Sequence, residues 1–272
     1  MAALRVRSVL VVLVVLAGCQ GIAGRGGETP TLTPVPVPTM SPTDRPPQTL
    51  APGMTDAGVT DPDALAAAHA AALAGTPVTY HATYTERTAG GRLRSRTVTA
   101  IRYGRGDRYD YRRTDVEPGR PDRHVDRWST GERVLERQVV GANTTYRVLR
   151  GSDGDPLAPG VALPVDRSRS GGIERVFRAV DTQVVGRTVE NGTTYYRVQS
   201  TGMTTPNPTA VRNASLVARV DATGVVHRYR LTYTIDRGAD AGRVQVTGTV
   251  RFTDIGTTTI ERPAWTGRVE NE

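Results

Sequence analysis

The sequence contains no lysine, so all 35 of its basic side chains are arginine, and it has a single cysteine. One cysteine excludes a disulfide framework within the chain. Two explanations fit the missing lysine: the codon usage of a GC-rich genome, or selection for the planar guanidinium group, which binds phosphates and carboxylates in a bidentate manner. The formal net charge of +8 favours anionic lipid headgroups, acidic glycans or acidic proteins as partners without identifying one.

Catalytic and metal-binding patterns are also missing. The four histidines fall in separate predicted elements, and no two of them have the spacing of a metal chelate. There is no Gly-x-Ser-x-Gly turn, no phosphate-binding glycine loop and no recognisable pair of catalytic carboxylates. We therefore expect a protein that is not an enzyme and that has neither a cofactor nor a metal site.

Residues 1–18 have the order of a secretory signal. Arg5 and Arg7 precede a short apolar run at Val9–Leu16, which is about half as long as a membrane-spanning helix needs to be. Leu16-Ala17-Gly18-Cys19 then matches the lipobox of bacterial and archaeal lipoproteins. We predict that a lipid on Cys19 anchors the chain to the outer face of the cytoplasmic membrane. The alternative is a plain cleaved signal in which the cysteine has no role.

Residues 19–55 are predicted to form a disordered spacer. This segment is rich in threonine and proline and has few large apolar side chains, so it cannot bury enough surface to fold. Alternating proline favours an extended conformation that lifts the following domain away from the membrane. The threonines are candidate sites for O-linked sugars, and a passive tether is the alternative. The folded domain is expected over residues 56–272.

Two helices are predicted in this domain. Asp61 is a good N-cap, Pro62 suits a first helical turn, and the alanine-rich run that follows ends at Gly75. A second helix is expected over residues 172–180, because apolar side chains recur there at helical spacing.

Most of the remaining sequence alternates with a period of two, which is typical of strands. Strands are expected at 79–84, 93–103, 108–113, 123–129, 132–140, 225–235 and 244–252, and two similar hairpin segments are expected to include 144–148 and 193–198. In the clearest of them one face carries Val225, His227, Tyr229, Leu231, Tyr233 and Ile235. We predict an α+β fold that is mainly β, a curved antiparallel sheet with one buried face and with most of the arginines on the wetted face.

Three sequons, at Asn143, Asn191 and Asn213, are candidates for N-glycosylation. Each is expected at a turn or at the edge of a loop, and Asn191-Gly192 is also a strong signal for a type I′ hairpin. Asparagine is a common turn residue in any protein, which is the alternative explanation.

Tyrosine is the common aromatic residue, with 10 copies beside two phenylalanines and two tryptophans. All of the tyrosines lie in predicted strands. Tyrosine suits the wall of a partly wet cavity because it has an apolar body and a polar tip, although an ordinary core is the alternative. The candidate cavity residues are Tyr80, Tyr84, Tyr229, Leu231, Tyr233 and Phe252.

Several segments together resemble haloarchaeal surface lipoproteins of unknown function. They are the lipobox, the Thr/Pro spacer, residues 56–61 before the alanine helix, Trp128-Ser129, and the closing run from Phe252 to Trp265. The basic charge departs from the acidic surface expected of haloarchaeal proteins. More distantly, one helix followed by a curved sheet resembles the LolA/LppX lipoprotein-carrier fold, which implies a half-barrel around an apolar cavity.

Two functions are compatible with these observations. The first is a surface-tethered domain that binds a lipid or another apolar ligand in a half-barrel. The second is an envelope interaction module with a filled core, which binds an acidic polymer or protein through exposed arginines such as Arg92, Arg94 and Arg96. No nucleic-acid partner is expected.

Overall fold

The computed structural model describes residues 46–163, 167–203, 211–238 and 242–269, so the predicted signal, Cys19 and most of the predicted spacer lie outside the described residues. The helices are α1 (Pro62–Leu73), α2 (Pro159–Ala162), α3 (Ser170–Arg178) and α4 (Thr266–Val269). The strands are β1 (Thr49–Ala51), β2 (Met54–Thr55), β3 (Gly58–Val59), β4 (Val78–Thr88), β5 (Leu93–Tyr103), β6 (Tyr109–Val116), β7 (Arg123–Ser129), β8 (Val134–Val140), β9 (Asn143–Val148), β10 (Val180–Glu190), β11 (Thr193–Met203), β12 (Arg212–Asp221), β13 (Val226–Asp236) and β14 (Arg243–Thr253).

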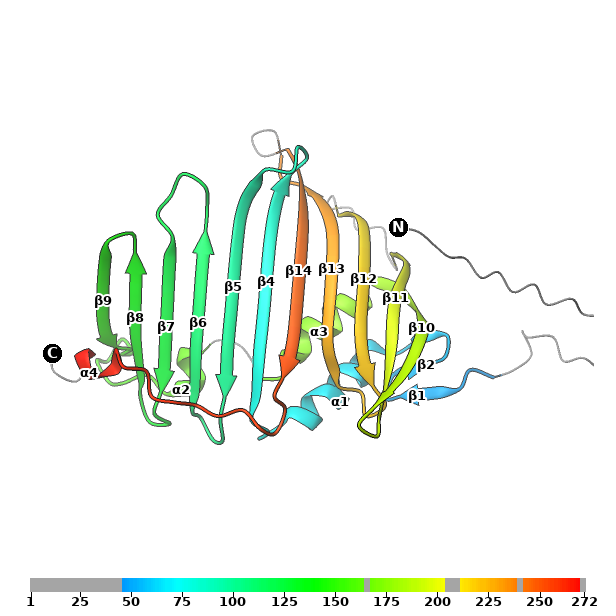
Figure 1. The fold of residues 1–272 in the computed structure, drawn as a ribbon, viewed down its shortest axis with the longest axis horizontal. Coiled ribbons are helices and arrows are strands. Elements are labelled where there is room, and N and C mark those ends of the chain that lie inside the picture. The colour runs from blue at the N-terminus through cyan, green and yellow to red at the C-terminus, as the bar shows by residue number, and fades with distance from the viewer. Residues whose placement is uncertain (1–45, 164–166, 204–210, 239–241, 270–272) are drawn as a thin grey trace, which may run out of the picture. The chain divides into compact units, whose positions relative to one another are not determined.

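An 11-stranded antiparallel sheet forms the body of the domain, in the order β10-β11-β12-β13-β14-β4-β5-β6-β7-β8-β9. Strands β4 to β9 run in succession from the centre to one edge, and β10 to β14 return from the other edge to the centre, where β14 pairs with β4. Figure 1 shows the sheet with α1 and α3 behind it. The predicted fold class, a curved and open antiparallel sheet with few helices, is confirmed.

The two predicted helices are present. Asp61 caps α1 by accepting hydrogen bonds from the backbone N–H groups of Asp63 (3.1 Å) and Ala64 (3.0 Å). Gly75 adopts a φ of 66° just beyond the helix, a left-handed conformation that glycine reaches without strain. The second predicted helix, α3, begins slightly earlier than expected and buries Ile173 and Phe177.

The inner face of the main sheet is the face that α1 and α3 cover, and it carries Tyr80, Ala82 and Tyr84 of β4. The ring of Phe252 is buried there between His69 of α1 (centroids 4.7 Å apart) and Tyr80 (5.4 Å). His69 is fully buried and joins three elements: its Nδ1 accepts from the N–H of Val226, and its Nε2 lies 2.9 Å from the carbonyl oxygen of Ser168. This bonding defines a neutral imidazole with the proton on Nε2, donated to Ser168.

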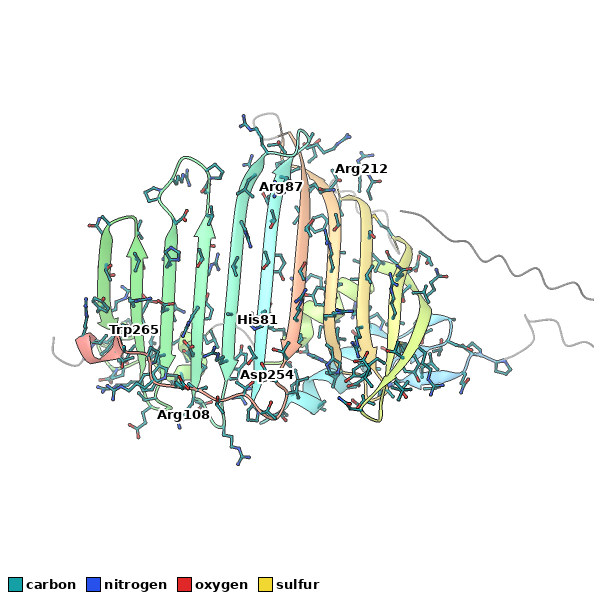
Figure 2. All side chains as sticks on the ribbon, in the orientation of Figure 1. His81, Arg87, Arg108, Arg212, Asp254 and Trp265 are labelled. Carbon is teal, nitrogen blue, oxygen red and sulfur yellow. The ribbon has the colours of Figure 1, made fainter. Side chains whose placement is uncertain are left out.

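The outer face is not wetted along its whole length, which differs from the prediction of one buried and one wetted face. At β7 to β9 a second core forms on the outer face, where Trp128 and Leu135 pack with Val269 of α4. The segment after β14 runs across the outer face to reach this place (Figures 1 and 2), and Trp265 packs against the same cluster. This end of the sheet therefore has a second, smaller core on the outer face, while the main core on the inner face continues to Tyr109 and Val134.

Ordered structure begins before residue 56, the expected start of the domain. Strands β1, β2 and β3 form a small antiparallel sheet, and Ala51 and Met54 are buried within it. The N–H of Val59 donates to Thr182 Oγ1 of β10 at 2.8 Å, which ties this small sheet to an edge of the main one. Part of the predicted spacer, residues 49–55, therefore belongs to the folded unit.

Strand β13 confirms the predicted alternation only in part. From Tyr229 to Ile235 alternate side chains share the inner face, but the register shifts between Arg219 and Val220 of the neighbouring strand. Because of this irregularity both Val225 and Val226 are buried, and His227 pairs with Asp221 (Nε2 to Oδ2, 2.8 Å).

Candidate ligand-binding site

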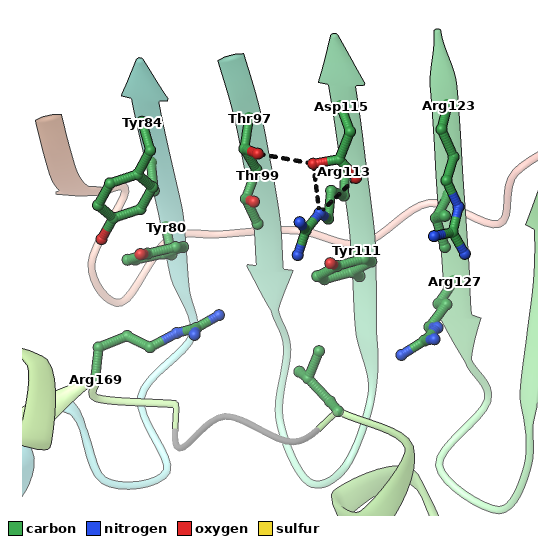
Figure 3. A pocket seen from close by; sticks show the side chains of 13 residues that line it. Tyr80, Tyr84, Thr97, Thr99, Tyr111, Arg113, Asp115, Arg123, Arg127 and Arg169 are labelled. Carbon is green, nitrogen blue, oxygen red and sulfur yellow. Dashed lines mark hydrogen bonds and ion pairs between the residues drawn. The ribbon is translucent and has the colours of Figure 1, made fainter. Parts of the chain in front are cut away.

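Small side chains at the middle of the inner face leave an open space over β4 and β5. Ala82, Thr97 and Thr99 form the floor of a cavity of about 600 Å³, and larger side chains of β4, β6 and β7 rise around it. Arg169, which precedes α3, lies at its lower side (Figure 3), and Leu163, which follows α2, also lines it. We call this space the tyrosine–arginine pocket; it is lined by Tyr80, Ala82, Tyr84, Thr97, Thr99, Tyr111, Arg113, Asp115, Arg123, Val125, Arg127, Leu163 and Arg169.

The lining of this pocket has an excess of positive charge. Its single carboxylate, Asp115, accepts hydrogen bonds from Arg113 Nε (2.8 Å) and Thr97 Oγ1 (2.7 Å). Burial alone would raise the pKa of Asp115, but these hydrogen bonds and the nearby guanidinium charges hold it below its usual value. Asp115 is therefore ionised at neutral pH and neutralises Arg113.

Arg127 is held by groups outside the cavity. Its Nε donates to Glu136 Oε2 at 2.7 Å, and its Nη1 donates to the carbonyl oxygen of Ala162 at 2.7 Å. Glu136, which is almost fully buried, also accepts from Arg147 Nη2 at 2.6 Å. The carboxylate of Glu136 is thus shared by two arginines and is saturated.

Arg123 and Arg169 supply the positive charge that remains. Arg123 donates to the Gln138 amide oxygen at 3.3 Å, and neither Arg123 nor Arg169 forms an ion pair within the described residues. Arg169 lies over the ring of Tyr80, with its guanidinium carbon 4.5 Å from the ring centroid. Its Nε is buried without a hydrogen-bond partner among the described residues, and its backbone is held at a φ of 56°. Figure 3 shows Arg169 and Arg127 pointing into the pocket from opposite sides.

A second cavity lies on the same face beside α3. It has a volume of about 760 Å³, and most of the side chains around it are apolar. We call it the α3 cavity; it is lined by Gly171, Glu174, Arg175, Val176, Arg178, Ala179, Val180, Met203, Val211, Ala214, Leu231, Tyr233 and Ile235.

The two cavities are neighbours across one glycine. Leu231 of the α3 cavity pairs with Gly248 of β14, and Gly248 pairs with Tyr84 of the tyrosine–arginine pocket. A Cβ at Gly248 would lie 2.9 Å from the Tyr84 ring, so the ring rests directly on this glycine. Strands are spaced by roughly 4.8 Å, which puts Leu231 and Tyr84 about 10 Å apart along the row.

The predicted cavity residues therefore separate into two groups. Tyr80 and Tyr84 line the tyrosine–arginine pocket, and Leu231 and Tyr233 line the α3 cavity. Tyr229 and Phe252 line neither of these two spaces. Phe252 belongs to the core beneath α1, a position that strand alternation cannot separate from a cavity wall. Burial, and then the neighbouring Tyr84 hydroxyl, raises the pKa of both Tyr80 and Tyr229, so both phenols stay neutral.

Sequence reasoning missed the charged side of this site. Most of the arginines were expected on the wetted face, but register places Arg113, Arg123 and Arg127 on the inner face. The sequence shows whether each arginine occupies an odd or an even position in its strand. It does not show which of the two faces the helices cover. The available signal was Gly248, because a lone glycine inside a strand pattern indicates close approach of another group.

The arginines predicted to form a stripe are all exposed but are not equivalent. Arg92 precedes β5, and a β-bulge interrupts the ladder at this end of β4 and β5. Arg94 Nε lies 3.6 Å from Glu86 Oε2 and is thereby paired. Of the three, Arg96 is the one that keeps the predicted outer-face position in the ladder.

All three sequon asparagines are exposed. Asn191 and Gly192 have φ values of 49° and 78° in the β10–β11 turn, as a type I′ turn requires. Asn143 begins β9, and Asn213 lies inside β12 at a register irregularity, also with positive φ. Whether any of them carries a glycan stays a prediction.

Within the described residues, no group of three or more His, Cys, Asp or Glu side chains is placed to bind a metal ion. The same part of the chain contains no helix that is long and apolar enough to cross a membrane.

No protein-family model and no curated protein sequence matches this chain. Similar solved structures include LprF from Mycobacterium bovis (12% identity, covering 75% of this chain and 97% of that one, TM-score 0.36) and a DUF1329 family protein from Desulfovibrio piger (11%, 75% and 94%, 0.28). A LolA superfamily protein from Nitrosomonas europaea is also similar (9%, 72% and 93%, 0.25). TM-scores this low support no statement about ligands, and the assignment of the fold comes from strand order and register.

Proposed function

We propose that this protein is a non-catalytic binding domain for an acidic amphiphile, and that a lipid on Cys19 tethers it to the outer face of the cytoplasmic membrane. The apolar part of the ligand occupies the α3 cavity, and its acidic group meets Arg123 and Arg169 in the tyrosine–arginine pocket. The observation that carries the proposal is the row Leu231–Gly248–Tyr84, which joins an apolar space to a cationic one on a single face.

Charge supports an acidic group over a neutral one. Arg113 and Arg127 already have carboxylate partners, Asp115 and Glu136, whereas Arg123 and Arg169 have no carboxylate within ion-pair distance among the described residues. A buried guanidinium N–H that lacks an acceptor is unfavourable by about 1–3 kcal/mol, and an anionic ligand would supply the acceptor for Arg169. A purely apolar ligand would leave it unsatisfied.

The path between the cavities supports an elongated ligand. Gly248 has no side chain, so the ring of Tyr84 rests directly on its backbone where the two spaces meet. This ring, which is 44% exposed, is therefore the single side chain of the row Leu231–Gly248–Tyr84 that stands between the apolar space and the cationic one.

Mass spectrometry of organic extracts from the native protein tests this function. We expect an acidic amphiphile to co-purify with the protein and to be lost from an Arg123→Gln/Arg169→Gln variant. A matched variant, Arg87→Gln/Arg212→Gln, removes the same charge from two exposed positions (labelled in Figure 2) that line neither cavity, and it should keep the ligand. A protein that is reproducibly empty, or equal loss of ligand from both variants, would contradict the proposal.

Membrane attachment is tested separately at Cys19. The Cys19→Ser variant removes the chain's single thiol, so no thioether can form. We expect it in the culture medium or as an unprocessed precursor, whereas the native protein partitions into detergent, because each buried methylene of a lipid chain contributes about 0.8 kcal/mol. Normal processing together with retention in the membrane after a high-salt wash would show that the lipobox assignment is wrong.

A further inference from the structure

The outer face of β11 to β14 carries one arginine from each strand in a single cross-strand row. Arg197 pairs with Arg219, Arg219 with Arg228, and Arg228 with Arg251. We propose that this outer arginine row binds a linear acidic polysaccharide that runs across the strands. The site lies on the face opposite the two cavities, so it is independent of the proposed amphiphile ligand.

The arginine row does not stabilise the folded chain. Like charges directly opposite one another on neighbouring strands are destabilising, and the row contains three such pairs in succession. Among the described residues, the one carboxylate that forms an ion pair with the row is that of Glu190, whose Oε2 lies 2.6 Å from Arg219 Nη2. Arg197, Arg228 and Arg251 are exposed and form no ion pair with any described residue. An external anion would remove the repulsion that the chain itself leaves in place.

The arginine row also lies along a hollow in the outer face, which a ligand could occupy. A shallow cavity of about 710 Å³ follows it, and Arg230 adds a further guanidinium beside Arg228. The Arg219 guanidinium is stacked on the Tyr195 ring, 3.7 Å from its centroid, which fixes its orientation. Its Nε is buried and has no hydrogen-bond partner among the described residues. One donor in the middle of the row is therefore positioned and still unsatisfied.

The spacing of the row favours a polysaccharide over other polyanions. Neighbouring strands bring successive arginines roughly 4.8 Å apart, close to the length of one sugar unit in an extended chain. In duplex DNA each strand carries a phosphate about every 3.4 Å along the helix axis and winds around that axis, so its phosphates do not follow a straight row. Each guanidinium can bind a carboxylate or sulfate group through two parallel hydrogen bonds, which a uronic-acid or sulfated chain presents in sequence.

Binding of polygalacturonate to the full chain in a neutral detergent tests the proposal, with uncharged dextran as the control polymer. We expect Arg228→Gln/Arg251→Gln to bind polygalacturonate at least about tenfold more weakly and to show a shallower dependence on salt, because two charged contacts are lost. The Arg87→Gln/Arg212→Gln variant should bind as the wild type does, since it has the same net charge and keeps the row. The row variant should melt no lower than the wild type, because a like-charge pair has been removed.

Three results would overturn the proposal. They are no binding of polygalacturonate by the wild type, equal weakening in the row and control variants, and equally tight binding of polyphosphate, single-stranded DNA or anionic vesicles through the same residues. Arg123→Gln/Arg169→Gln should leave polygalacturonate binding unchanged, so failure at the row is distinguishable from failure of the amphiphile site.

Discussion

The two ends of the main sheet share one ladder of hydrogen bonds, but their inner faces differ in chemistry. Over β10 to β14 the inner face is covered by α1 and α3, and its lower part is filled by side chains such as Phe252, Leu216 and Val198. Over β5 to β9 the middle of the same face carries Asp115 and Glu136 with their arginines, while Trp128 of β7 and Leu135 of β8 pack on the outer face.

This difference shows how one sheet can be both stable and open. The filled end derives its stability from buried apolar area, which needs helices on top of it. The charged end is held by hydrogen-bonded carboxylates, by the second core on the opposite face and by the short helix α2, whose Ala162 carbonyl accepts from Arg127. No long helix lies over Thr97 and Thr99, where room is left. The space for a ligand lies at the boundary between the filled end and the charged end of the sheet.

The most direct test of this difference is to truncate one aromatic side chain on each side of the boundary. We expect Phe252→Ala to lower the free energy of unfolding by about 3–5 kcal/mol, because it opens a cavity between His69 and Tyr80. Tyr84→Ala should lower it by less than about 1 kcal/mol, because Tyr84 is 44% exposed. Urea unfolding measures both, and similar losses would mean that the space beside Tyr84 is part of the packed core.

At the filled end, removal of the Asp221 carboxylate is expected to have an intermediate effect on the free energy of unfolding. Burial alone would raise the pKa of Asp221, but hydrogen bonds from His227, Thr223 and the Val225 N–H hold it below its usual value. A lowered pKa in the folded state stabilises the protein above about pH 4 and loses that contribution as the pH falls through the folded value. We expect Asp221→Asn to be less stable than wild type by about 1–3 kcal/mol at pH 7. The difference between the two proteins should shrink by pH 2, and a constant difference would show that the carboxylate charge is not responsible.

The smallest effect is expected from filling the open space. Thr99→Leu adds apolar volume to the floor of the tyrosine–arginine pocket and should change the free energy of unfolding by less than about 1 kcal/mol while reducing amphiphile retention. Thr83→Leu places the same change on the outer face of β4 and serves as the control for retention. A large loss of stability in Thr99→Leu alone would indicate that the pocket closes in solution.

Much of the fold was predictable because its elements are determined locally. The capped alanine helix and the strands at 93–103 and 123–129 agree with α1, β5 and β7, since capping and period-two alternation depend on neighbouring residues. The small sheet of β1 to β3 was missed, because strands of two or three residues are too short to show a period.

The site was predictable only in part, because pairing partners come from tertiary structure. That Tyr84 faces Thr97 on one side and Gly248 on the other follows from register, which alternation alone leaves open. The outer arginine row is a still clearer case. Arg228 and Arg251 are distant in sequence, and nothing in either strand shows that they lie side by side.

The central place of β14 also fixes when the sheet can be completed. This strand is the last of the sheet to be synthesised, yet it lies between β13 and β4 and joins the two successive series of strands. Until Thr253 has emerged, β4 and β13 both present unpaired edges, which readily pair with other chains. Long-range pairings of this kind also form slowly, because the intervening loop must close first. A chain shortened before Arg243 would therefore yield two separate sheets with four free edges.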